Sequence, residues 1–298
     1  MASENQLLDP VAIHKAEMLG LQARQIVEGY MAGEHKSPYR GFAIEFSQHR
    51  EYVPGDDTRH LDWKVLGRSD RYYIKQYEQE TNYVANILVD GSESMQYGSG
   101  KVSKFDYART MAACLGYLIL LQRDAASLSI FDSEVRDHYP RTDNLSSIHN
   151  IMNLLTGFVP ERTTGIAAVL HAMAQQVKRK GIFILISDFF DDVDEVLGGI
   201  QHLRFGGGEV IVFHVLDAYE LDFPFKGCVE FQGLEGGPKL ITRPAELRKS
   251  YLEEINKFIK KLRDGCEQNG CNYVQVNTAT PWHEVLSSYL ATRQHRYG

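Results

Sequence analysis

From residue 83 onward, two kinds of apolar and polar pattern follow each other in turn along the chain. Short apolar runs of strand length alternate with longer segments in which apolar residues recur every three or four positions. The first pattern predicts buried β-strands and the second predicts amphipathic helices. The predicted strands are 83–90, 126–131, 182–187, 209–216 and 272–276, and the predicted helices are 104–123, 144–156, 165–179, 192–204, 244–268 and 281–293.

The alternation of strand and helix predicts the fold class. Apolar strands separated by helices are typical of a mostly parallel sheet covered on both faces. We therefore predict an α/β fold with a doubly wound, mostly parallel sheet over residues 79–298, in which 134–139 adds a short edge strand. A segment rich in glycine and proline near 217–243 interrupts the alternation and predicts an insertion of loops with one short hairpin.

The N-terminal part of the chain has a different character. Asp9 as N-cap and Pro10 at the first helical position introduce apolar residues at helical spacing, which predicts an amphipathic helix to about Met31. The stretch from Gly33 to Arg71 is richer in glycine, proline, aspartate and arginine, and we expect it to be irregular. Residues 1–78 are thus predicted to be a helical and irregular extension packed on the core.

Composition narrows the class of protein. The chain has 298 residues, of which 43% are hydrophobic and 24% charged, as in an ordinary soluble globular protein. Its net charge of −7 argues against a nucleic-acid partner. No apolar run approaches the roughly 18 residues that span a bilayer, and the N-terminus lacks a signal-peptide pattern, so we expect a cytoplasmic protein without membrane insertion. Four scattered cysteines indicate reduced thiols.

Oxygen-bearing side chains follow several predicted strands. In a doubly wound sheet, ligands bind outside the carboxyl ends of the strands. Asp90, Ser92 and Ser94 follow the first strand of the sheet, a threonine pair at 163 and 164 precedes a helix, and Asp188 ends a later strand. Hard oxygen ligands suit Mg²⁺, Mn²⁺ or Ca²⁺ rather than zinc or copper. A turn or helix cap is the structural alternative for Asp90 and Ser92.

This set resembles the metal-ion-dependent adhesion site of von Willebrand factor A domains in both order and placement. The resemblance implies that Ser92 and Ser94 bind the cation directly through their hydroxyls. It also implies that Thr164 binds directly in one state of its loop, and that Asp90 and Asp188 act largely through water. Thr164 is preferred to its neighbour Thr163, which occupies a position that is commonly glycine in that family.

A second resemblance covers most of the chain. The run from Tyr52 to Trp63, the motif Tyr77-Glu78-x-Glu80 and later pieces such as Arg248-x-x-Tyr251 resemble the family of unknown function numbered 58. Members of that family are often encoded beside MoxR-type AAA+ ATPases. The resemblance implies an accessory to such an ATPase in the assembly or remodelling of other proteins, with a metal-dependent site that accepts an aspartate or glutamate from a protein partner.

The acidic and aromatic cluster between Tyr52 and Trp63 has two interpretations. Arginine presents a planar fork that can bind two carboxylates, so Arg59 can hold a structural ion-pair cluster with Trp63 buried against the sheet. The same residues can instead form an exposed partner-binding surface. The structural interpretation is the favoured one. The residues concerned are Asp56, Asp57, Arg59, Asp62 and Trp63.

Enzyme functions are less well supported by the sequence. A Mg²⁺-dependent phosphoryl hydrolase could use Asp90 as its nucleophile, but a haloacid-dehalogenase pattern needs a second aspartate at position 92, where this chain has serine. The run Gly98-Ser99-Gly100-Lys101 lacks the remaining residues of a Walker A loop. We therefore predict no catalytic residues, no organic cofactor and a binding protein rather than an enzyme.

Overall fold

The computed structural model describes residues 44–53, 62–69, 72–79, 84–176, 181–233, 240–282, 284–286 and 288–289. Within it the chain divides into two compact units, one of residues 32–82 and the other containing residues 83–298. The helix predicted for residues 10–31 lies outside the described residues.

The unit that contains residues 83–298 is built on one mixed sheet. Its order is β10-β7-β6-β3-β4-β5, and all neighbours are parallel except β4 and the edge strand β5. The doubly wound, mostly parallel sheet predicted from the sequence is therefore confirmed. The strands are β3 (Val84–Asp90), β4 (Ala125–Phe131), β5 (Val135–Thr142), β6 (Gly181–Ser187), β7 (Glu209–Leu216) and β10 (Asn272–Asn277).

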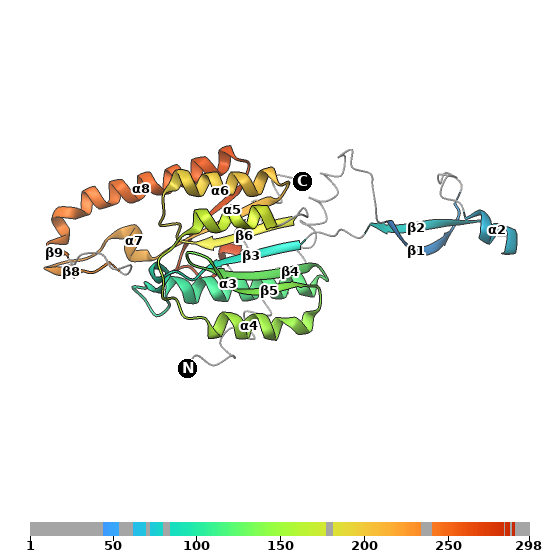
Figure 1. The fold of residues 1–298 in the computed structure, drawn as a ribbon, viewed down its shortest axis with the longest axis horizontal. Coiled ribbons are helices and arrows are strands. Elements are labelled where there is room, and N and C mark those ends of the chain that lie inside the picture. Colours follow the sequence, from blue (N-terminus) through green and yellow to red (C-terminus); the bar gives the residue numbers. More distant parts are fainter. Residues whose placement is uncertain are drawn as a thin grey trace. The chain divides into compact units, whose positions relative to one another are not determined.

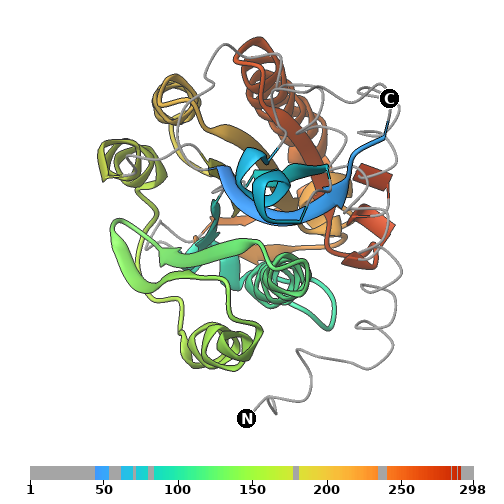
Figure 2. The ribbon, with the colours of Figure 1, turned by 90° about the vertical axis from the view of Figure 1, so that its right-hand side faces the viewer.

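Helices cover both faces of this sheet (Figure 1). One face packs against α3 and α4 and the other against α5, α6 and α8, and the turned view shows the same two groups on opposite sides (Figure 2). Because both faces are covered, β3, β4 and β7 are buried along their whole length. The helices are α3 (Lys104–Leu121), α4 (Ile148–Gly157), α5 (Ile166–Gln176), α6 (Val193–Phe205) and α8 (Pro244–Gln268).

Local capping signals fix where the key helices begin. Ser103 caps α3 and forms a reciprocal capping box with Asp106. Asp192 caps α6 by accepting the backbone N–H groups of Asp194 and Glu195. Both helices therefore start within two residues of the predicted positions. Among the described helices none is long and apolar enough to cross a membrane.

The interval 217–243 contains a short helix and a small strand pair. Helix α7 (Ala218–Asp222) begins with a capping box between Asp217 and Glu220, a spacing present in the sequence but not expected there to form a helix. Strands β8 (Val229–Phe231) and β9 (Leu240–Thr242) pair antiparallel. Phe223 has a φ of 45° and stacks on Tyr251 at the start of α8, with ring centroids 4.4 Å apart.

The unit of residues 32–82 contains an antiparallel ribbon. Strands β1 (Ile44–Glu51) and β2 (Tyr73–Gln79) pair with a register shift between Phe46 and Gln48, and α2 (Trp63–Ser69) lies between them in sequence. The expectation of an irregular segment up to Arg71 was thus wrong for β1 and α2. The polar sequence of β1 carries little alternation, and its pairing partner lies more than twenty residues further along the chain, so a local pattern could not show it.

Candidate metal site at the carboxyl ends of strands β3 and β6

The ends of β3 and β6 bring the two predicted carboxylates to one place. The strands are parallel neighbours, with Val89 opposite Ile186, so Asp90 and Asp188 follow at the same edge. Both aspartates are 0% exposed. A side chain at position 91 would collide with the ring of Phe158, so glycine is needed for the loop to leave the strand here.

Asp90 is anchored by hydrogen bonds from both neighbouring loops. Its Oδ1 accepts the backbone N–H of Ser92 at 2.9 Å, and its Oδ2 accepts the hydroxyl of Ser187, the last residue of β6. Burial, and then the charge of Asp188, raise the pKa of Asp90 to about 7, although the hydrogen bonds from Ser187 and Ser92 oppose this shift. The site therefore holds a carboxylate whose charge is costly unless a cation is near.

The hydroxyls of Ser92 and Ser94 lie together on the loop after β3. Their Oγ atoms are 3.0 Å apart, and Ser92 is itself buried. Two ligands at the roughly 2.0–2.1 Å typical of Mg²⁺, in adjacent octahedral positions, are about 2.9 Å apart. The spacing of the two hydroxyls therefore fits an octahedral cation.

The loop with the predicted threonine is joined to this loop. The backbone N–H of Glu93 donates to the carbonyl of Arg162 at 2.8 Å. Gly165 donates to the carbonyl of Asp132, just after β4. Thr164 is half-buried, whereas Thr163 is exposed. The loop that precedes α5 is thus held beside the Asp90 loop, and Thr164 is the less exposed of the two threonines.

A lysine that the sequence analysis did not single out reaches the site. Lys104, the first residue of α3, is fully buried, and its Nζ lies 2.7 Å from Asp188 Oδ2 and 2.7 Å from Glu220 Oε1. Burial alone would lower the pKa of Lys104, but the carboxylates of Asp188 and Glu220 outweigh burial and raise it. Burial raises the pKa of Glu220, partly offset by Lys104. Lys104 therefore stays an ammonium.

The backbone after β6 is held in a strained conformation. Phe189 has a φ of 55°, a region that bulky residues rarely adopt, and its ring is buried. Its N–H donates to the hydroxyl of Ser187 at 2.8 Å, and the N–H of Phe190 donates to Asp188 Oδ1 at 3.2 Å. The bond from Phe190 holds one oxygen of the Asp188 carboxylate, and backbone strain of this kind is often retained at functional sites.

The donor set fits a hard divalent cation such as Mg²⁺, Mn²⁺ or Ca²⁺ better than zinc or copper. Ser92 and Ser94 would hold the ion directly, Thr164 would add a third hydroxyl, and Asp90 and Asp188 would act through water. In the part of the chain that the structure describes, no group of three or more His, Cys, Asp or Glu side chains is arranged to hold a metal. A metal at this site would therefore depend on hydroxyl ligands.

The second predicted cluster is described only in part. Asp62 is 6% exposed, and its Oδ1 accepts the N–H of Val65 at 3.3 Å in the first turn of α2, so it has a structural role. The side chain of Trp63 is 67% exposed. It opens a seven-residue helix beside a two-stranded ribbon, which offers little surface to cover an indole. Asp56, Asp57 and Arg59 lie outside the described residues.

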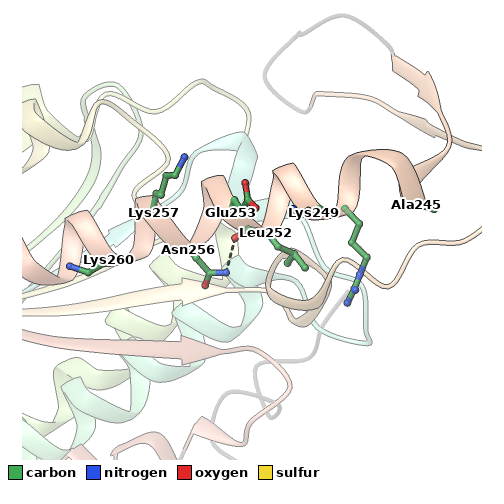
Figure 3. Close-up of a pocket in the computed structure, with 8 residues that line it drawn as sticks. Ala245, Lys249, Leu252, Glu253, Asn256, Lys257 and Lys260 are labelled. Carbon is green, nitrogen blue, oxygen red and sulfur yellow. Dashed lines mark hydrogen bonds between the residues drawn. The ribbon is translucent and has the colours of Figure 1, made fainter.

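A hollow along α8 is separate from this site. It is lined by residues of that one helix, among them Lys249, Glu253 and Lys257 (Figure 3). The bond drawn there runs from the Asn256 amide to the carbonyl of Leu252, within the helix itself. The residues that line it are long, mostly exposed side chains, and none of them belongs to the predicted metal set.

Comparison with known proteins identifies relatives without established roles. An uncharacterized protein of Mycobacterium tuberculosis and one of Mycobacterium bovis are each 24% identical over 303 residues, covering 96% of this chain and 91% of theirs. Among solved structures, BatB from Bacteroides thetaiotaomicron matches with 16% identity and a TM-score of 0.45, covering 72% of this chain and 99% of that one. The VWA domain of SpRpn10 matches with 12% identity and a TM-score of 0.36, covering 69% and 93%.

The family model described as "Protein of unknown function DUF58" matches residues 48–258, from strand β1 into helix α8. This interval includes all five predicted metal ligands as well as Lys104 and Glu220. Because the match covers most of the chain, this protein belongs to the DUF58 family.

Proposed function

We propose that this chain is a protein-binding adaptor whose site at the ends of β3 and β6 holds one divalent cation, Mg²⁺ or alternatively Mn²⁺ or Ca²⁺. The observation that carries the proposal is the pair of hydroxyls on Ser92 and Ser94, 3.0 Å apart beside the buried Asp90. Hydroxyls leave the charge of the cation largely unneutralised. An aspartate or glutamate of a partner protein can then complete the coordination.

We propose a MoxR-type AAA+ ATPase as the partner class, with this chain as an accessory in the assembly or remodelling of other proteins. This proposal rests on the resemblance to family members that are often encoded beside such ATPases. An adaptor needs a site that binds and releases its protein partner without a covalent reaction. A cation with an open position satisfies this requirement, because exchange of water for a carboxylate is reversible.

A phosphoryl hydrolase is the weaker alternative. Asp90 is 0% exposed and both its oxygens already accept hydrogen bonds, so it is poorly placed to attack a phosphorus atom. The ammonium of Lys104 is bound by Asp188 and Glu220 and is not available to a phosphate. Measurable phosphoester turnover that disappears in Asp90→Asn would favour the hydrolase instead.

The metal is tested by its effect on stability. At a free Mg²⁺ concentration about 100 times the dissociation constant, binding to the folded state should stabilise it by about 2.7 kcal/mol. Ser92→Ala should abolish this gain while lowering metal-free stability by about 1 kcal/mol, because one buried hydrogen bond is lost. Ser146→Ala, which removes an exposed hydroxyl on another loop, is the matched control and should keep the full gain. Denaturant unfolding with and without Mg²⁺ measures both quantities.

The adaptor role is tested with purified partner. A MoxR-type ATPase from the same source should bind the chain in Mg²⁺, and both EDTA and Ser92→Ala should reduce the affinity at least about tenfold. Binding that is equal with and without EDTA would contradict a metal-dependent contact. The unfolding experiment with and without Mg²⁺ would still test whether the site binds a metal.

A further inference from the structure

Lys104 is placed by its helix and then completely enclosed. The capping box of Ser103 and Asp106 fixes the first turn of α3, and the side chain of Lys104 is 1% exposed. A buried ammonium is stable only when it is paired and hydrogen-bonded. Its Nζ has two carboxylate partners at 2.7 Å and lies 4.6 Å from the centroid of the Phe190 ring.

Those two carboxylates belong to different parts of the sheet edge. Asp188 directly follows β6 and belongs to the candidate metal set, whereas Glu220 lies in α7. The second oxygen of Glu220, Oε2, accepts the N–H of Asp217 at 2.8 Å. Asp217 Oδ2 in turn accepts the N–H of Ser99 at 3.0 Å and the hydroxyl of Thr278 at 3.1 Å. Glu220 is therefore fixed independently of Lys104, and the ammonium lies between two rigid acceptors.

An ammonium on Asp188 Oδ2 competes with a metal for the same carboxylate. The other oxygen of Asp188 accepts the N–H of Phe190, so neither oxygen is without a donor inside the protein. The ammonium of Lys104 and a divalent cation are both positive, and like charges repel strongly in a poorly solvated place. Because Lys104 already balances the charge of Asp188, a divalent cation bound at Ser92 and Ser94 gains little attraction from this carboxylate.

We propose that the ion pair of Lys104 with Asp188 withholds Asp188 from the metal, and so sets a weak metal affinity and leaves positive charge for the partner's carboxylate. This rests on the proposed divalent-cation site. Lys104 is thus a positioning residue, which acts through Asp188 rather than by touching metal or partner.

The inference gives opposite predictions for two variants. Lys104→Gln removes the competing charge and should tighten Mn²⁺ binding by at least about tenfold, since charges in such a site interact at low effective dielectric. Glu220→Gln removes one of the two carboxylates that pair with Lys104. The ammonium should then hold Asp188 more strongly, and Mn²⁺ binding should weaken. Lys101→Gln removes an equal charge from an exposed position three residues earlier and should change affinity less than twofold.

Calorimetric titration of the full chain with Mn²⁺ alone measures these affinities. A merely structural ion pair would give a Lys104→Gln protein with lower stability and equal or weaker metal binding, and this result would overturn the inference. If Lys104→Gln does not fold, the double variant with Glu220→Gln removes both partners and should bind Mn²⁺ at least about tenfold more tightly than Glu220→Gln alone. Equal affinities there would also overturn it.

The same titration separates the inference from the proposed function. A wild-type chain that binds no Mn²⁺, beside a Lys104→Gln chain that does, would contradict metal-dependent function and support the role of Lys104. Absence of binding in every variant would contradict both. Tight wild-type binding that Lys104→Gln leaves unchanged would keep the metal site and remove the role of Lys104.

Discussion

At the scale of single residues, the candidate site is a set of short polar side chains held under a sheet edge. Ser92 and Ser94 supply oxygen, Asp90 supplies a buried charge, and hydrogen bonds from both strand ends fix their positions. Burial disfavours the ionised form of Asp90, and for the same reason a cation beside Asp90 would stabilise its carboxylate. Two predictions belong at this scale.

The first concerns the two adjacent threonines before α5. Thr164→Ala should weaken Mg²⁺ binding about tenfold, because the hydroxyl ligand of a half-buried side chain is removed. Thr163→Ala removes the same group from an exposed position and should leave affinity within a factor of two. Isothermal titration of both variants makes the comparison. Equal effects of the two changes would remove Thr164 from the ligand set.

The second concerns His214, which is fully buried and hydrogen-bonded through Nδ1 to the hydroxyl of Tyr273 at 2.7 Å. Burial lowers the pKa of His214 to about 3 from an ordinary 6.5. The unfolded chain therefore binds a proton that the folded chain does not, and this contribution to stability is present above pH 6.5 and is lost as the pH falls from 6.5 toward 3.

His214→Asn keeps an amide that can bond to Tyr273 but cannot take up the proton. The stability advantage of the wild type over this variant should shrink below pH 6.5 by up to about 1.4 kcal/mol per pH unit. Asp90, whose pKa is raised to about 7, acts with the opposite sign but is present in both proteins. Urea unfolding between pH 7 and pH 4.5 measures the difference, and a constant difference would mean that His214 is protonated in the fold.

At the scale of elements, the packing of the helices on one face of the sheet depends on how closely α5 and α6 can approach each other. Helices α5 and α6 meet at Gly199, where a Cβ atom would lie 2.8 Å from Leu170 Cβ and 3.3 Å from the carbonyl of Ala167. One residue earlier, at Gly198, the nearest atom would be His171 Nε2 at 3.9 Å. Close packing therefore requires glycine at position 199 but leaves room for a methyl group at position 198.

Alanine at these neighbouring positions should act in opposite directions. Gly199→Ala should cost about 1–3 kcal/mol, because it forces two packed helices apart. Gly198→Ala should leave the free energy of unfolding unchanged or raise it by about 0.5–1 kcal/mol, because alanine is the better helix former and has room at this position. Thermal and denaturant unfolding test both. A destabilised Gly198→Ala protein would show that the seam is tighter than these distances indicate.

At the scale of the whole molecule, the two units differ in how much they can bury. The sheet of residues 83–298 is covered on both faces by helices of the same unit. The ribbon of residues 32–82 has two paired strands and a short helix in its described part, and such ribbons are marginal by themselves in water. The metal set, Lys104 and Glu220 all belong to the larger unit.

A chain of residues 83–298 should therefore fold cooperatively and keep the Mg²⁺-dependent stabilisation of the full chain within about 0.5 kcal/mol. Calorimetry and circular dichroism, with and without Mg²⁺, provide the measurement. Loss of cooperative unfolding in this fragment would mean that residues before 83 complete the core. Retained folding with loss of the metal effect would place part of the site in those residues.

The sequence by itself determined the elements and the ends of strands. Apolar runs bounded by glycine and polar residues located β3, β6 and β7, because a strand buried on both faces must be apolar throughout. The structure then pairs β3 with β6, and Asp90 and Asp188 lie at the same edge because the two strands are parallel neighbours. The ribbon of β1 and β2 was not predicted, because its strands are largely polar and carry little alternation.

Only the tertiary structure decided what surrounds those carboxylates. A lysine at the start of an amphipathic helix is expected to face water, yet Lys104 is buried between Asp188 and Glu220, which lie 84 and 116 residues away along the chain. Nothing within one turn of Lys104 predicts either partner. Burial of a charge is settled by which distant groups arrive to pair with it, since without them the ammonium would stay in solvent or lose its proton.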